Sequence, residues 1–203
     1  YKMTSEEYKQ ILFRKINEIL YNNPDIKGAL HSKITKDNVY QPALTGVRDN
    51  FIDFMYHIIE EESNIKGLEN IKKLHEISQS GKSCLICARH TTNFDVPNMY
   101  YLMKKFGVEE IFNDIVFIAG RKLNEEHEIV LFLTSMFPRI VIIPKGEEIE
   151  DSVSINMAAQ RVLKKIKYEK KIILLYPTGT RERSWSPETK IPVRETYNYV
   201  ASF

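Results

Sequence analysis

The first 80 residues carry apolar side chains at helical spacing. A T-x-x-E capping box from Thr4 to Glu7 opens the first stretch, and Asn22–Pro24 closes it. Two further apolar stripes follow over residues 51–59 and 68–77, while residues 24–45 show no clear pattern beyond a short helix and a loop. Since amphipathic helices bury one face, this pattern predicts a helical N-terminal segment over residues 1–80.

From Ser83 onward the pattern changes to short runs rich in Ile and Val. These runs, which we expect to be strands, cover residues 83–89, 115–119, 140–144 and 172–177. The helical stretches between them cover residues 94–106, 126–136 and 152–168. Continuous apolar runs are typical of strands buried on both faces, and strict strand–helix alternation favours parallel pairing. We therefore expect an α/β domain over residues 81–203, with a mostly parallel sheet flanked by helices.

Composition narrows the class of protein but does not identify it. The 203 residues are 43% hydrophobic and 28% charged, as in ordinary globular domains. The net charge of +2 is too small to indicate nucleic-acid binding, and no apolar run approaches the roughly 18 residues of a membrane span. Cys84 and Cys87 fall in one apolar strand, so we expect both to be buried. So few cysteines favour a reducing compartment, either the cytoplasm or a plastid-like stroma.

A histidine and an aspartate follow the first predicted strand, where α/β sheets place their ligand sites. His90 lies at the strand end, and Asp95 falls in the first turn of the next helix, with Thr92 or Asn93 as its cap. A carboxylate on one imidazole nitrogen leaves the other free as a base. The chain has no G-x-S-x-G nucleophile motif, so we expect the base to act on a substrate hydroxyl. The alternative is a polar strand end with an incidental acid.

Basic residues follow the other three predicted strands. Arg121 and Lys145 come after the second and third strands, and Arg181 and Arg183 after the fourth. In an extended segment Arg181 and Arg183 point the same way, and two guanidinium groups suit a phosphate. Because parallel strands end at one edge, all these cations are expected near His90. The alternative for the arginine pair is a solvated loop.

Three ordered blocks resemble those of the glycerolipid acyltransferases, which acylate glycerol-3-phosphate or lysophosphatidate. HTTNFD, from His90 to Asp95, matches the family's His-x4-Asp block, and FPRIVIIPK resembles its second block, with Lys145 at the basic position. YPTGTRERS resembles the third block, F-P-E-G-T-R-S-R, with Thr178 in place of Glu. Its matching residues are Gly179, Thr180, Arg181 and Arg183.

The resemblance implies transfer of a fatty acyl group from acyl-CoA or acyl carrier protein to glycerol-3-phosphate, in phospholipid synthesis. His90 would be the base and Asp95 its orienting acid, with no metal or other cofactor. The residues that would bind the phosphorylated substrate are Arg121, Lys145, Gly179, Thr180, Arg181 and Arg183.

Several alternatives stay open at this point. The acceptor is either glycerol-3-phosphate or lysophosphatidate, and contact with a membrane surface is an option for either. A non-catalytic phospholipid-binding relative and a different α/β enzyme, such as a phosphate-ester hydrolase, are the other two function classes. Family domains usually run further than Phe203, so we expect the domain to continue past it.

Overall fold

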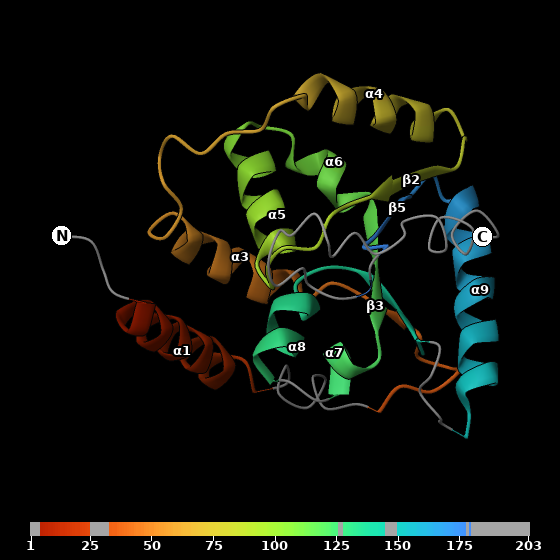
Figure 1. Ribbon diagram of the computed structural model, residues 1–203, viewed down its shortest axis with the longest axis horizontal. Helices are drawn as coiled ribbons and strands as arrows, with labels where there is room; N and C mark the ends of the chain where they lie inside the picture. The colour runs from red at the N-terminus through yellow and green to blue at the C-terminus, as the bar shows by residue number, and fades with distance from the viewer. Residues whose placement is uncertain (1–4, 25–32, 126–127, 145–149, 178, 180–203) are drawn as a thin grey trace, which may run out of the picture.

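The computed structural model describes residues 5–24, 33–125, 128–144, 150–177 and 179. Within them, five strands form one sheet in the order β1-β4-β3-β5-β2. Figure 1 labels β2, β3 and β5. The strands are β1 (Tyr40–Gln41), β2 (Cys84–Cys87), β3 (Ile115–Gly120), β4 (Arg139–Ile142) and β5 (Ile172–Leu175). Strands β2 to β5 are paired in parallel, and β1 lies antiparallel to β4. The predicted α/β class with a mostly parallel sheet is confirmed.

Helices connect the strands and also precede them. They are α1 (Ser5–Asn22), α3 (Thr45–Met55), α4 (Leu68–Gln79), α5 (Asp95–Lys105), α6 (Glu109–Asn113), α7 (Lys122–Glu125), α8 (Glu128–Ser135) and α9 (Ser152–Tyr168). Five of these agree closely with the predicted stretches, but α3 begins ahead of the apolar stripe predicted at residues 51–59 and ends within it. Within the described ranges, no helix combines the length and apolar composition that crossing a bilayer requires.

Helices cover both faces of the sheet (Figure 1). On one face, Phe117 and Leu174 join an apolar cluster with side chains from α1, α3, α5, α6 and α8. On the other face, Val116 joins a second cluster, to which α9 contributes Ile155 and Ala159. Side chains alternate between the two faces along a strand, so both faces of β3 are buried. This accounts for the continuous apolar runs at β3 and β5. The division of the chain near residue 80 stays a prediction.

Strand β2 is an exception because it lies at the edge of the sheet. Cys84 is buried beneath α4, but Leu85 is 43% exposed and Cys87 is also exposed. The prediction that both cysteines are buried was therefore wrong for Cys87. The described helices leave the second face of this edge strand open, which an apolar sequence run alone does not reveal.

The order of the strands brings distant segments together. After β4 the chain returns through α9 and enters the sheet as β5, between β3 and β2. The four parallel strands end at one edge, which we call the carboxyl edge, and begin at the opposite amino edge. The segments after Cys87 and Leu175 are thus neighbours at the carboxyl edge, although they are far apart in the sequence.

Candidate active site

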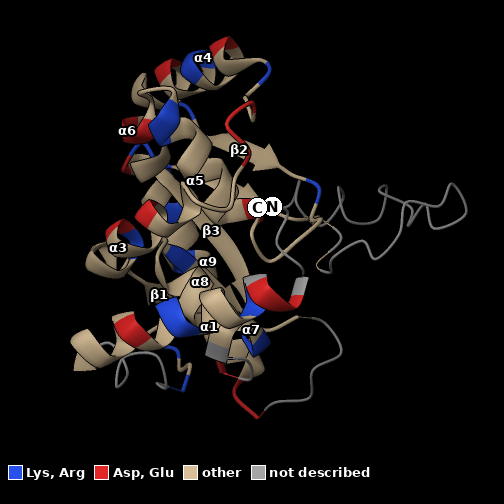
Figure 2. Cartoon of the chain, turned by 90° about the vertical axis from the view of Figure 1, so that its left-hand side faces the viewer, with Lys and Arg blue, Asp and Glu red and all other residues tan. Residues whose placement is uncertain are grey.

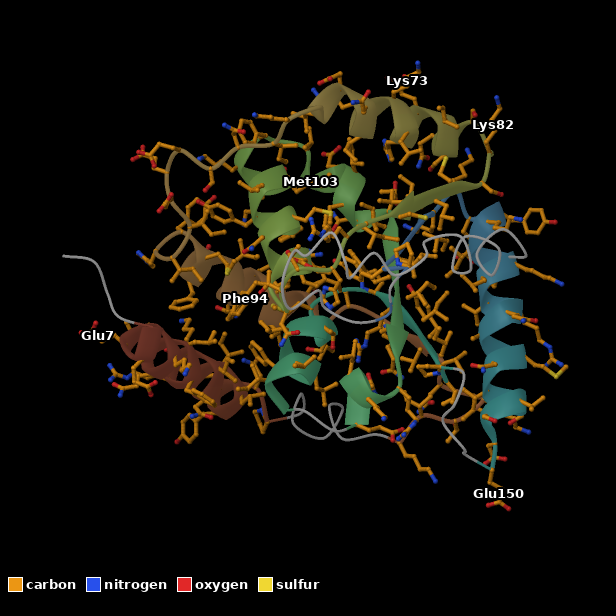
Figure 3. The ribbon with its side chains drawn as sticks, in the orientation of Figure 1. Glu7, Lys73, Lys82, Phe94, Met103 and Glu150 are labelled. Carbon is orange, nitrogen blue, oxygen red and sulfur yellow. The ribbon has the colours of Figure 1, made fainter. Side chains whose placement is uncertain are left out.

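The segment after β2 carries the predicted histidine to the carboxyl edge. The Ala88 N–H donates to the Leu175 carbonyl at 3.0 Å, which extends the β2–β5 pairing by one residue. Helix α5 then begins at Asp95 with Phe94 as its N-cap, not Thr92 or Asn93 as predicted. The Thr92 hydroxyl instead accepts the Phe94 N–H within the loop, at 3.3 Å. Figure 3 labels Phe94 at this entry to α5.

His90 and Asp95 form the pair that the spacing predicted. Nδ1 of His90 lies 2.7 Å from Oδ2 of Asp95, and the two side chains are 16% and 14% exposed. The carboxylate also accepts the Thr91 N–H at 2.8 Å, the Thr91 hydroxyl at 2.7 Å and the Thr92 N–H at 3.0 Å. Both carboxylate oxygens are therefore held by the loop that carries His90.

These hydrogen bonds decide the charge of Asp95. Burial raises the pKa of its carboxyl, but the hydrogen bonds from His90, Thr91 and Thr92 outweigh burial and hold the pKa below its usual value. Asp95 is thus an anion at neutral pH and has only acceptors to offer. Nδ1 of His90 must then donate to it, which leaves Nε2 as the basic nitrogen.

Tyr176, the residue after β5, packs flat against the histidine. The phenol and imidazole rings are stacked, with centroids 4.4 Å apart and planes inclined by 25°. The Tyr176 hydroxyl is buried without a hydrogen-bond partner in the described chain. Burial raises the pKa of this hydroxyl, and the nearby charge of Asp95 raises it further. The contact of Tyr176 with His90 could not be predicted from the sequence, because it depends on β5 lying beside β2.

Two of the predicted substrate-binding residues are described at the carboxyl edge. Arg121 follows β3, and its N–H donates to the Ile142 carbonyl at 2.9 Å. Its guanidinium pairs with Glu125 of α7, and the second oxygen of Glu125 accepts the Ile34 N–H at 3.1 Å. Gly179 follows β5 in a turn with φ of +63°, where its N–H donates to the Tyr176 carbonyl at 2.9 Å. That left-handed conformation favours glycine.

The other four predicted substrate-binding residues lie outside the described residues. They are Lys145, Thr180, Arg181 and Arg183. The structure therefore brings together His90 and Asp95 and places Arg121 and Gly179 at the same edge of the sheet. Convergence of the remaining cations on His90 stays a prediction.

A buried arginine at the start of β4 binds helix α7, which follows the end of β3. Arg139, at the start of β4, is only 5% exposed, and burial lowers its pKa to about 10. Its Nη2 and Nε donate to Oδ1 of Asn124 in α7, at 2.5 and 3.2 Å, and its Nη1 donates to the Thr134 carbonyl at 3.4 Å. A charged residue in the apolar run FPRIVII was the available signal. Arg139 and Arg121 both bind α7, so they hold this helix beside the end of β3.

The described side chains form no metal site, and the sequence comparisons with known proteins found no match. Within the described ranges, no group of three or more His, Cys, Asp or Glu side chains is arranged to hold a metal ion. No protein-family model matches the sequence, and no curated protein matches it significantly.

Proposed function

We propose that the protein transfers a fatty acyl group from an acyl thioester to the hydroxyl of glycerol-3-phosphate. The observation that carries the proposal is the His90–Asp95 pair, whose carboxylate is held by four hydrogen bonds from its own loop. The pair lies where α/β sheets bind their ligands, past the carboxyl ends of parallel strands. An oriented imidazole with one basic nitrogen is the group that acyl transfer to a hydroxyl needs.

The reaction requires a proton acceptor and then a proton donor. Nε2 of His90 takes the proton of the acceptor hydroxyl while its oxygen attacks the thioester carbonyl carbon. The tetrahedral intermediate collapses, the carbon–sulfur bond breaks, and the thiolate takes the proton back from His90. Asp95 keeps the imidazole in one orientation and stabilises its cationic form. The products are the acyl ester and the free thiol, and His90 is regenerated without a covalent intermediate.

Cations at the same edge would hold the phosphate of the acceptor. Arg121 follows β3 and His90 follows β2, and both strands pair with β5, so the two residues lie at the same edge of the sheet. Lys145, Arg181 and Arg183 complete the proposed phosphate site.

The test is an assay of thiol release with two donors and two acceptors. Acyl-CoA and acyl carrier protein are each combined with glycerol-3-phosphate and with lysophosphatidate, using the wild type and His90→Ala. We expect release that needs an acceptor and is lost in His90→Ala, with glycerol-3-phosphate the better acceptor. A preference for lysophosphatidate would correct the substrate but not the chemistry. Absence of release with every pair, from folded full-length protein, would favour a non-catalytic phospholipid-binding role.

A further inference from the structure

Tyr176 contacts the ring face of His90, in addition to the hydrogen bond between His90 and Asp95. The two rings come from segments after β5 and β2, and they lie nearly parallel with centroids 4.4 Å apart. The chain brings them together only through the insertion of β5 between β3 and β2. His90 is thus held from two directions, by Asp95 at its Nδ1 edge and by Tyr176 on its ring face.

The sheet provides the space that the phenol ring occupies. The β2–β5 pairing, carried one residue further, places Ala88 beside Tyr176. The β3–β5 pairing, carried two residues further, places Ala119 on its other side. Two small neighbours leave room for one large aromatic ring, which packs on the main apolar cluster. The position of the ring is therefore fixed by packing.

The hydroxyl of Tyr176 does not contribute to that position. It is buried and has no hydrogen-bond partner in the described chain, which destabilises the folded state relative to a phenylalanine at the same place. The part of Tyr176 that contacts His90 is its aromatic face.

We propose that Tyr176 is a positioning residue whose ring face stabilises the cationic form of His90 during acyl transfer. This inference rests on the proposed function of the site. An aromatic face carries negative electrostatic potential and attracts a cation within about 6 Å of the ring centroid. The imidazole becomes cationic only while it holds the substrate proton, so the attraction is stronger in the transition state than in the resting site.

The groups that face His90 determine whether Tyr176→Leu stabilises or destabilises its cationic form. Within the described chain, the partners of its side chain are Asp95 from α5 and Tyr176 from the end of β5, while the adjacent Arg89 is exposed. Replacing Tyr176 by leucine keeps an apolar side chain but removes the ring face. The cation then loses stabilisation, so the histidine should release its proton at a lower pH.

A comparison of Tyr176→Phe with Tyr176→Leu tests this inference. Tyr176→Phe keeps the ring and removes the unpaired hydroxyl, so it should retain more of the wild-type kcat than Tyr176→Leu, and its melting temperature should rise by about 2 to 4 °C. Tyr176→Leu should lower kcat by roughly 2- to 30-fold. It should also move the acid limb of the kcat/KM profile to lower pH.

An NMR titration of the His90 imidazole supplies a readout that does not depend on turnover. Its midpoint should be lower in Tyr176→Leu than in Tyr176→Phe. Equal midpoints and equal kcat values in the two variants would overturn the role of the ring. Loss of kcat in Tyr176→Phe would also overturn it, because the hydroxyl would then be the functional part. Should wild type and His90→Ala both fail to release thiol, the proposed function fails, while the titration still tests the stack.

Discussion

Among the described residues, two histidine–aspartate pairs with nearly equal N···O distances lie at opposite edges of one sheet. At the carboxyl edge, His90 Nδ1 lies 2.7 Å from Asp95, and at the amino edge His75 Nε2 lies 2.8 Å from Asp114. The pairs differ in what else the carboxylate binds. Asp95 is held by the loop beside it, whereas Asp114 also accepts Lys171 Nζ at 2.6 Å. The distance between histidine and acid alone does not identify a catalytic pair.

The amino-edge cluster joins elements that are separate in the sequence. His75 lies on α4, Asp114 precedes β3 and Lys171 precedes β5, while Gln79 of α4 donates to Asp114 at 3.1 Å. The Ser78 hydroxyl adds a bond from α4 to the Lys170 carbonyl at 2.6 Å. Helix α4 lies at one end of the molecule, at the top of Figure 2, and carries acidic and basic residues side by side. We infer that this cluster holds α4 against the sheet, whereas the carboxyl-edge pair is the one for which we propose catalysis.

Removal of each histidine gives the largest expected difference between the two pairs. His90→Ala should lower kcat for acyl transfer by about 10²- to 10⁴-fold, because it removes the base. His75→Ala should leave kcat within about twofold. It should instead lower the free energy of unfolding, because it removes the hydrogen bond between His75 and the partly buried Asp114. Steady-state thiol release and urea unfolding measure the two effects. Comparable kcat losses in both variants would show that the edges do not have separate roles.

The aspartates extend the same comparison with substitutions that preserve shape. Asp95→Asn should lower kcat on the order of 10²-fold, because a neutral amide no longer fixes the donor nitrogen of His90 or stabilises its cation. Asp114→Asn should cost about 1 to 3 kcal/mol of unfolding free energy and leave kcat close to wild type. The measurement is kcat beside a urea titration for each variant. An Asp95→Asn protein with wild-type kcat would remove this residue from the mechanism.

Acid should weaken the fold partly through Asp114. Burial raises the pKa of its carboxyl, but bonds from Lys171 and His75 outweigh burial and leave the pKa below its usual value. A carboxyl whose pKa is lower in the folded than in the unfolded chain adds stability at higher pH. That contribution is lost as pH falls below about 4, where the unfolded chain takes up the proton first. Urea midpoints between pH 3 and 7 should therefore fall less steeply in Asp114→Asn than in wild type, and parallel curves would contradict this.

The long elements and the motif could be predicted from the sequence, whereas contacts across the sheet could not. The periodicity predicted α9 at residues 152–168, which is where the helix lies, and the spacing predicted the His90–Asp95 pair. Strand β1 and helices α6 and α7 have two, five and four residues, too few to show a period. The stack of Tyr176 on His90 and the exposure of Cys87 both depend on strand order. An apolar run does not specify that order.

The smallest predicted loss of kcat is for a substitution of Thr91. This residue has no counterpart at the amino edge among the described residues. Its hydroxyl donates to Oδ1 of Asp95 at 2.7 Å, and its N–H donates to Oδ2. Thr91→Val removes the hydroxyl bond but keeps the N–H bond and the side-chain shape. Since one such bond contributes about 1 kcal/mol, kcat should fall roughly 2- to 10-fold.

Thr91→Ser supplies the matched control, because serine keeps the hydroxyl and loses only a methyl group. Its kcat should stay within about twofold of wild type, and both variants should have the same KM for the phosphorylated acceptor. Equal kcat values for Thr91→Val and Thr91→Ser would mean that the backbone N–H groups of the loop hold Asp95 unaided. A lower kcat in Thr91→Val but not in Thr91→Ser would show that the Thr91 hydroxyl positions Asp95. At the amino edge, Asp114 instead binds a lysine from another segment, Lys171.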